Sequence, residues 1–256
     1  MFIDTHCHIF NEYYNNIDEL IEDCKINGIS KIIVNGCDIK SNMEVIKLIS
    51  KYNNVYGAIG FHPTELRNIV DDDICLEWLE NNIDNKKIVA VGEIGLDYHY
   101  NDTDKEKQLM MFKRQLDIAT KYNKPVIIHS RDAIQDTYNL LKKYKLNGSI
   151  HCFSGSVEMA RLFTSLGYKI GIGGIITYKN AKTIKEVVRD TDLAYILLET
   201  DSPYLAPVPH RGEDNNPKYI PIIADEIASI KGTSNLDIAR VTTANAEAVF
   251  DFSCEK

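Results

Sequence analysis

Histidine and carboxylate residues recur inside or at the ends of short apolar segments of this chain, and these residue types bind divalent metal ions. His6 and His8 are two positions apart, so in an extended segment both side chains point to one face. Glu93 lies within an apolar run, where a buried carboxylate calls for a cation or a proton. The candidate metal ligands are His6, His8, Glu93, His129, His151 and Asp201.

Such a set of ligands suits two divalent ions roughly 3.5 to 4 Å apart, each with an open position for water or substrate. The expected division is His6, His8 and Asp201 on one ion, His129 and His151 on the other, and Glu93 as the bridge. Glu93 and Asp201 are the expected catalytic residues, because both act on the step in which water attacks. The ions would be Mg²⁺ or Mn²⁺, with Zn²⁺ or another transition metal as the alternative. The imidazoles suit Mn²⁺, Zn²⁺ or similar ions better than Mg²⁺, which prefers oxygen ligands.

Other interpretations of these residues are weaker. Core histidines with satisfied hydrogen bonds would explain one His-x-His pair, but not a set of histidines and carboxylates distributed over five strand ends. A cysteine nucleophile is disfavoured, because the period of two turns Cys7 and Cys152 away from the adjacent imidazoles. No GxxxxGK[ST] phosphate-binding sequence occurs.

Short β-rich segments alternate with segments of helical period from end to end, which is typical of repeated βα units. The predicted strands cover residues 2–8, 31–37, 55–61, 88–94, 125–130, 149–153, 168–175 and 195–200. The predicted helices cover residues 17–28, 41–52, 72–82, 104–122, 132–144, 156–166, 181–191 and 219–231, followed by a last helix at 236–250. Ser41, Asp132 and Ser156 are expected as N-caps, and Gly28 and Gly167 where helices stop.

This pattern predicts the α/β class, with a (β/α)8 TIM-type barrel and an extra C-terminal helix in a single domain over residues 1–256. An open doubly wound sheet has the same periodicity. The closed barrel is favoured because His6 and Asp201, on the first and last strands, become neighbours only if the sheet closes. Gly92 and Gly95 are expected to leave room around Glu93.

Composition restricts the partners and the compartment. Lys plus Arg is 29 and Asp plus Glu is 37, a formal charge of −8, so any attraction to nucleic acid must be local. The six cysteines, Cys254 included, lack CxxC spacing and are expected to be buried, reduced thiols. Neither an export signal nor an apolar run of about 18 residues occurs, so we expect a cytoplasmic protein without membrane contact.

Five motifs, in their order and spacing, resemble those of the TatD-like deoxyribonucleases of the amidohydrolase superfamily. They are Asp4-Thr5-His6-Cys7-His8, Gly92-Glu93-Ile94-Gly95-Leu96-Asp97-Tyr98, His129-Ser130-Arg131, His151-Cys152-Phe153-Ser154-Gly155 and Glu199-Thr200-Asp201-Ser202-Pro203-Tyr204-Leu205. The resemblance covers residues 2 to about 250. It implies a (β/α)8 barrel, divalent-metal dependence and hydrolysis of DNA phosphodiester bonds, with the ligand assignment given above. For some members it implies exonuclease activity, and for others deacylation of mischarged transfer RNA.

The resemblance extends to residues that would contact the substrate. Gly60-Phe61-His62-Pro63 is similar to a family segment, so His62 is expected to contact a phosphate. Arg131 offers a planar donor fork for a phosphate, and Arg211 lies in the loop after the last strand. Glu199 should support the metal ligands without binding metal itself.

The chain departs from the family pattern at two places. Glu213 and Asp214 follow His210-Arg211-Gly212, where the family commonly has basic residues. An arginine often found shortly after the tyrosine of strand 4 is absent from Tyr98-His99-Tyr100-Asn101-Asp102. Both departures argue against a long nucleic-acid track, so we expect single-stranded ends or short DNA as substrates.

The predicted function is a divalent-metal-dependent hydrolase, most directly a monomeric deoxyribonuclease that cleaves phosphodiester bonds with water activated by two metals. The alternatives are another amidohydrolase-type enzyme acting on an ester, a lactone or a D-aminoacyl-tRNA, and a non-catalytic metal-binding scaffold. Many relatives of the first kind bridge their metals with a carboxylated lysine. Glu93 at that place favours the deoxyribonuclease branch.

Overall fold

The computed structural model describes residues 1–253, so Cys254 lies outside the described residues. Its backbone contacts divide the chain into two compact units. The first unit comprises Met1–Val34 and His151–Ala248, and the second comprises Asn35–Ile150 and Val249–Lys256. We describe each unit by itself.

Eight strands follow one another in the sheet in chain order. They are β1 (Phe2–Cys7), β2 (Ile29–Asn35), β3 (Val55–Ile59), β4 (Ile88–Asp97), β5 (Val126–Arg131), β6 (Gly148–Ile150), β7 (Lys169–Ile172) and β8 (Ile196–Leu198). Within the first unit the segment after β8 returns to β1, where Cys7 and Ser202 form a parallel bridge. The predicted (β/α)8 barrel of TIM type is therefore confirmed.

Helices follow the strands as the periodicity predicts. They are α1 (Ile17–Ile26), α2 (Ile39–Lys51), α3 (Asp72–Asn82), α4 (Lys105–Lys121), α5 (Ile134–Leu141), α6 (Val157–Ser165), α7 (Lys182–Asp190), α8 (Ile220–Lys231) and α9 (Asn235–Val249). The additional helix α9 is the predicted C-terminal one. After it, Phe252 packs in the second unit, where the hydroxyl of Tyr56 donates to its carbonyl at 3.3 Å.

One of the three predicted helix caps is correct. Ser156 caps α6 by accepting the N–H of Met159. The prediction for Ser41 is wrong, because Asp38 is the cap of α2 and Ser41 is the third helical residue that closes a capping box with it. The prediction for Asp132 is wrong as well, since α5 starts after Ala133.

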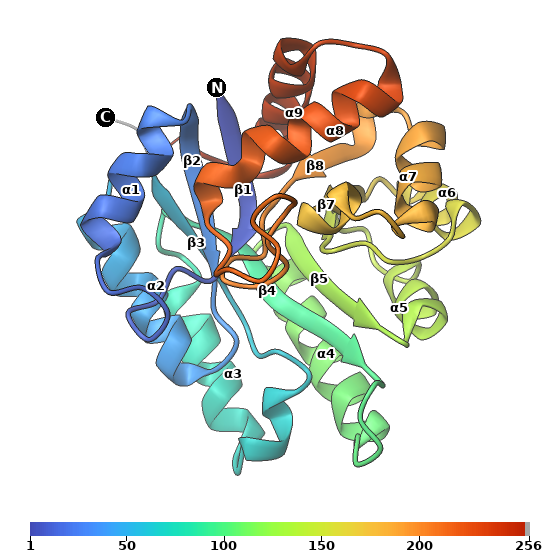
Figure 1. The fold of residues 1–256 in the computed structure, drawn as a ribbon. Coiled ribbons are helices and arrows are strands. Elements are labelled where there is room, and N and C mark those ends of the chain that lie inside the picture. Colours follow the sequence, from blue (N-terminus) through green and yellow to red (C-terminus); the bar gives the residue numbers. More distant parts are fainter. Residues whose placement is uncertain (254–256) are drawn as a thin grey trace. The chain divides into compact units, whose positions relative to one another are not determined.

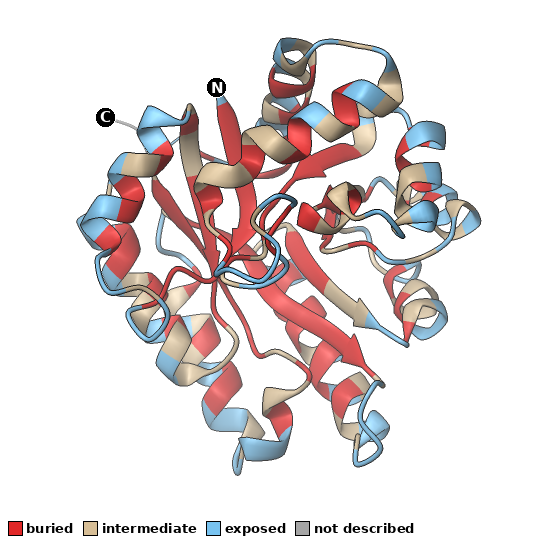
Figure 2. Cartoon of the chain, viewed as in Figure 1, coloured by how far each residue is buried: buried red, intermediate tan, exposed pale blue. Residues whose placement is uncertain are grey.

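In the second unit, β3 and β4 are buried along their whole length. All residues of β4 are buried, and α4 packs against this strand (Figure 1). On β5 the buried residues give way to half-buried and exposed ones at the carboxyl end (Figure 2). Polar groups at the carboxyl ends of the strands are therefore positioned by the buried parts of these strands and remain accessible to solvent.

The glycines beside Glu93 have a different role from the predicted one. A Cβ atom at Gly92 would lie 2.7 Å from Cβ of Ile127, and one at Gly95 would collide with the backbone of His129. Both glycines thus let β5 approach β4 closely, and they do not make space around the Glu93 side chain. The prediction was wrong because the neighbour they accommodate is more than thirty residues away in sequence.

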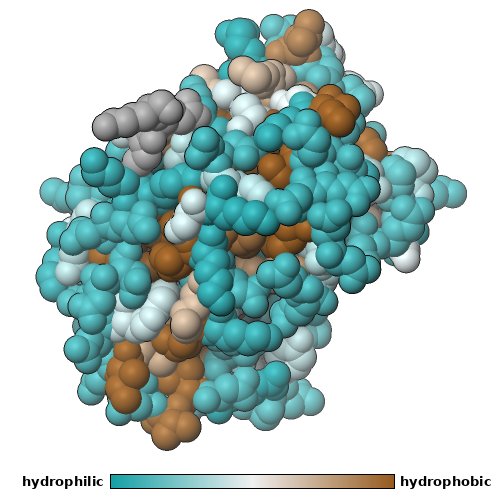
Figure 3. Space-filling view, turned by 90° about the vertical axis from the view of Figure 1, so that its left-hand side faces the viewer, coloured by the Kyte–Doolittle hydropathy of each residue, from teal (hydrophilic) through white to brown (hydrophobic). Residues whose placement is uncertain are grey.

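Exposed hydrophobic side chains gather between α2 and α3, where Met43, Val70 and Ile74 line a shallow pocket. Hydrophobic side chains collect low on the face shown in Figure 3. Of the cysteines, Cys7, Cys24 and Cys75 are buried as expected, whereas Cys37 and Cys152 are only half-buried. None of the helices in residues 1–253 combines the length and hydrophobicity that a membrane span requires.

Candidate metal-ligand clusters

In the first unit, the carboxyl end of β1 brings two imidazoles against a carboxylate. The Nε2 atoms of His6 and His8 lie 3.1 Å apart, and Oδ1 of Asp201 lies 3.6 Å from each of them. All three potential ligand atoms fall within 4.8 Å of one another. We call these three residues the His6 cluster.

Backbone hydrogen bonds fix the position of Asp201 relative to the two histidines. The N–H of Asp201 donates to the carbonyl of His6 at 2.9 Å, and the N–H of His8 donates to the carbonyl of Ser202 at 2.6 Å. Asp201 has a φ of 58°, a left-handed conformation that aspartate tolerates better than most residues. Burial by itself would raise the pKa of Asp201, but the imidazoles of His151, His8 and His6 lower it below its usual value. Asp201 is therefore ionised at neutral pH.

His151 packs directly on this cluster. Its ring stacks on that of His6, with centroids 3.6 Å apart and planes inclined by 16°. Its Nδ1 lies 3.2 Å from Oε1 of Glu199, which is fully buried and also accepts the N–H of Cys152. Glu199 thus contacts His151, a candidate metal ligand. A carboxylate in this position can hold the imidazole in one orientation.

Asp4 lies on the same face of β1 as the two histidines, but its role is structural. Its carboxylate accepts the hydroxyl of Thr200 at 2.6 Å and the N–H of Thr200 at 3.0 Å. Burial raises the pKa of Asp4 to about 8, although these hydrogen bonds lower it. Asp4, two residues before His6, therefore ties β1 to Thr200, the residue before Asp201.

In the second unit, β4 carries a nearly fully buried carboxylate between two imidazoles. Oε1 of Glu93 lies 2.9 Å from Nδ1 of His129 and 3.4 Å from Nε2 of His62. The three potential ligand atoms again fall within 4.8 Å of one another. We call these three residues the Glu93 cluster. The thiol of Cys37 donates to the second oxygen of Glu93 at 3.9 Å.

The orientation of His129 is set by Asp97, four residues after Glu93 on the same strand. Nε2 of His129 donates to Oδ2 of Asp97 at 3.1 Å. Burial by itself would raise the pKa of Asp97, but the hydrogen bonds from His129 and from the N–H of His99 lower it. If the hydrogen bond to Asp97 keeps the ring proton on Nε2, Nδ1 of His129 would be the nitrogen that binds a metal ion on the side of Glu93.

The opposite tautomer follows for His62. Its Nδ1 accepts the N–H of Thr64 at 3.2 Å and lies 2.7 Å from the hydroxyl of the same residue. The ring proton of neutral His62 therefore sits on Nε2, on the side of Glu93. A protonated Nε2 donates hydrogen bonds and does not bind metal. That His62 contacts a substrate phosphate stays a prediction.

Both clusters have the chemistry of metal sites. Two imidazole nitrogens and an ionised carboxylate converge in the His6 cluster, and a single proton cannot satisfy all three groups. In the Glu93 cluster, His129 offers Nδ1 beside the carboxylate. Imidazole and carboxylate ligands suit Zn²⁺, Mn²⁺ and related ions.

The remaining predicted contacts lie at the surface. Arg131 is exposed at the end of β5, and its guanidinium carbon is 6.0 Å from the ring centre of Tyr100. Arg211 is exposed in the loop after β8, with its guanidinium 4.6 Å from the ring centre of Tyr178. Sequence reasoning missed Asp97 as the partner of His129, although its spacing of four from Glu93 on a strand places both on one face.

Comparison with known proteins gives the family. Residues 3–251 match the model of the TatD-related DNase family. The chain belongs to the TatD-related DNase family. A relative from Bacillus subtilis, YabD, is 38% identical over 98% of this chain and 99% of its own length, and is named an uncharacterized metal-dependent hydrolase.

Solved structures agree with this membership. The TatD homolog YjjV of Escherichia coli has a TM-score of 0.92 and 34% identity, and the match covers 98% of each chain. A TatD family hydrolase of Entamoeba histolytica has a TM-score of 0.86 and 26% identity over 98% of each chain. The TatD-related chain is therefore a metal-dependent hydrolase. Its candidate ligands are His6, His8 and Asp201 of the His6 cluster, Glu93 and His129 of the Glu93 cluster, and His151.

Proposed function

We propose that this TatD-related protein is a deoxyribonuclease that uses two divalent ions and removes nucleotides from single-stranded ends or short DNA. The observation that carries the proposal is that each unit surrounds a carboxylate with imidazoles at the carboxyl end of its strands. The family model, named for DNases, supports DNA as the substrate class.

The ligands proposed for one ion are His6, His8 and Asp201. His129 and His151 are the ligands proposed for the other, and Glu93 is the proposed bridge. When bound, the ions would neutralise charge on the phosphodiester and lower the pKa of water.

The chain's own residues supply the other parts of the reaction. Asp201, which is ionised, accepts the proton that the attacking water loses. Asp97 holds the proton of His129 on Nε2, and Glu199 contacts Nδ1 of His151, so both imidazoles keep one orientation. Arg131 and Arg211 hold phosphates of the substrate by paired N–H donors.

The test is an incubation of metal-loaded protein with end-labelled single-stranded DNA, end-labelled duplex DNA and an acylated transfer RNA. We expect stepwise shortening of the single strand, slower attack on the duplex and an intact acyl bond. Release of the amino acid with intact DNA would replace the deoxyribonuclease proposal by a deacylase.

A further inference from the structure

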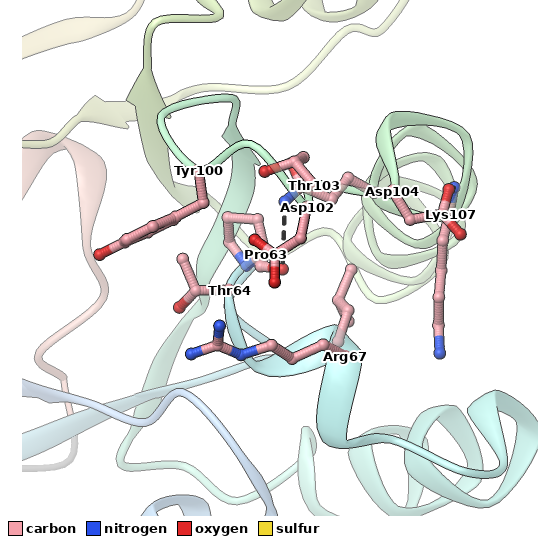
Figure 4. A pocket seen from close by; sticks show the side chains of 10 residues that line it. Pro63, Thr64, Arg67, Tyr100, Asp102, Thr103, Asp104 and Lys107 are labelled. Carbon is pink, nitrogen blue, oxygen red and sulfur yellow. Dashed lines mark hydrogen bonds between the residues drawn. The ribbon is translucent and has the colours of Figure 1, made fainter.

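A pocket of about 250 Å³ lies beside the Glu93 cluster in the second unit. Its walls come from the turn after β3, which leads into the short helix η1 (Glu65–Asn68), and from the loop between β4 and α4. Thr64, Arg67, Tyr100 and Asp102 face it (Figure 4). Small-molecule sites usually enclose roughly 300 to 1,000 Å³, so this pocket has room for about one nucleotide unit and not for a duplex.

The imidazole of His62, a member of the Glu93 cluster, connects the pocket to Glu93. Thr64, which lines the pocket, contacts Nδ1 of His62 through its hydroxyl at 2.7 Å. On its other edge, Nε2 of His62 lies 3.4 Å from Glu93. A group bound against Thr64 is thus separated from Glu93 by the imidazole of His62, which suits the neighbour of a bound phosphodiester.

The charged side chains of the pocket are not equivalent. Nζ of Lys107 donates to the carbonyl of Ile69 at 2.9 Å and pairs with Asp72 at 3.5 Å. Arg67 makes neither an ion pair nor a hydrogen bond within residues 1–253. In Figure 4 its guanidinium extends beneath Thr64 on the side of Tyr100, whereas Lys107 runs in another direction. Arg67 is therefore the cation available to an anionic ligand.

Tyr100 supplies an aromatic surface at the mouth of the pocket. The residue is 46% exposed, yet its ring packs against the edge of His99, at 5.3 Å between ring centres, and lies 6.0 Å from the guanidinium of Arg131. A braced and exposed ring is suited to stacking with a nucleobase, which is accessible only in a single strand. Asp102 would repel a second phosphate, but its carboxylate can accept a base amino group such as that of cytosine.

From these contacts we infer that the pocket is a subsite for one unpaired nucleotide next to the scissile phosphodiester. Arg67 binds its phosphate, Tyr100 stacks on its base, and Asp102 accepts its amino group. This inference rests on the proposed function and names the part of the substrate that the second unit recognises. Arg67 is also a basic residue beside the loop after β4, where this chain lacks the arginine that the family often has after Tyr98.

The experiment compares Arg67→Ala, Tyr100→Ala and Tyr100→Phe on two substrates. One is an end-labelled single-stranded oligonucleotide, and the other is bis(p-nitrophenyl) phosphate, which is too short to span the scissile site and the pocket. We expect KM for the oligonucleotide to rise about 5- to 50-fold in Arg67→Ala and Tyr100→Ala, the range of a lost stacking or phosphate contact. Tyr100→Phe should retain wild-type KM, and the small diester should be cleaved normally by all three.

Arg114→Ala is the matched control, because Arg114 is a partly exposed arginine on α4 that pairs with Asp73 and does not line the pocket. Binding of a fluorescein-labelled oligonucleotide to metal-free protein, followed by anisotropy, gives a readout that needs no catalysis. In Arg67→Ala the dependence of log Kd on log salt should fall by roughly 0.7, the value of one single-strand phosphate contact.

The outcomes separate the subsite from the proposed function. Unchanged oligonucleotide KM and binding in both alanine variants would overturn the subsite, as would an equal loss on both substrates. If wild-type protein cleaves neither substrate with any divalent ion, the proposed function fails. Weaker anisotropy binding in Arg67→Ala would in that case still support the subsite, and unaltered binding would overturn it too.

Discussion

Nε2 of His129 lies 3.1 Å from Oδ2 of Asp97, and this hydrogen bond leaves Nδ1 of the same ring 2.9 Å from Glu93. A carboxylate four residues further along β4 therefore decides which nitrogen of His129 can accept a metal ion. Partners of this kind hold a ligand in one tautomer and increase its basicity.

Asp97→Asn should weaken metal binding about 10- to 100-fold, because an amide no longer fixes the His129 proton on Nε2 by charge. The measurement is the metal concentration that gives half-maximal activity, with kcat at saturating metal nearly retained. Asp132→Asn is the control, since Asp132 pairs with the exposed His99 at 3.0 Å and lies outside both clusters. Equal metal dependence of wild type and Asp97→Asn would show that this hydrogen bond has no role in binding.

Gly171→Ala should disturb His151 through Glu199. A Cβ atom at Gly171 would collide with the buried carboxylate of Glu199, which contacts His151, whereas one at Gly173 would meet its nearest atom at 3.6 Å. We expect Gly171→Ala to lower both Tm and activity, and Gly173→Ala to change little. Thermal unfolding and turnover of the two variants test this, and matching values for both would refute it.

Residue spacing predicted the main features of the clusters. His6 and His8 share a face because a strand repeats every two residues, and Glu93 was identified because an apolar strand has no other reason to contain a carboxylate. The eight strands followed from the alternating units, and the closed barrel was favoured because candidate ligands lie on both the first and the last strand. These features depend on local sequence, so local sequence was enough to predict them.

The features that could not be predicted depend on neighbours distant in sequence. Gly92 and Gly95 accommodate β5, and their role cannot be derived from β4 alone. The N-cap of α2 is Asp38 and not the predicted Ser41, because Ser41 is the third helical residue and forms the other half of a capping box. Arg67 gave no sequence signal, since only the fold places the turn after β3 beside the loop after β4.

The identity of the metal is a separate prediction. Because imidazoles dominate the ligands, purified protein should retain a transition metal, and Mg²⁺ should support activity only at higher concentration. Elemental analysis of untreated protein, followed by chelation and titration with Mn²⁺, Zn²⁺ and Mg²⁺, measures both points. Protein that contains no transition metal and prefers Mg²⁺ would contradict the prediction.

The acidic loop after β8 should control the salt dependence of DNA binding. Glu213 pairs with His210 at 3.1 Å, next to the exposed Arg211. Glu213→Lys combined with Asp214→Arg should tighten binding of single-stranded DNA at low salt. If each new cation contacts a phosphate, the slope of log Kd against log salt concentration should steepen by about one to two units.

The control for this double variant is Glu77→Lys with Asp84→Arg, which makes the same charge change at exposed positions of the second unit. Hydrolysis of bis(p-nitrophenyl) phosphate should be the same in all forms. An identical increase in slope for both double variants would assign the effect to net charge and remove the loop from the substrate path.

The central claim is tested most directly by the hydrolysis rate of end-labelled single-stranded DNA in Glu93→Ala and Asp201→Ala at saturating Mn²⁺, with bound metal counted in the same samples. Wild type should bind two ions per chain. Each variant should remain folded, bind fewer ions and lose activity by about 10²- to 10⁴-fold, the contribution of a positioned base. Near-normal turnover in either variant, or full activity with a single ion bound to wild type, would contradict the two-metal account.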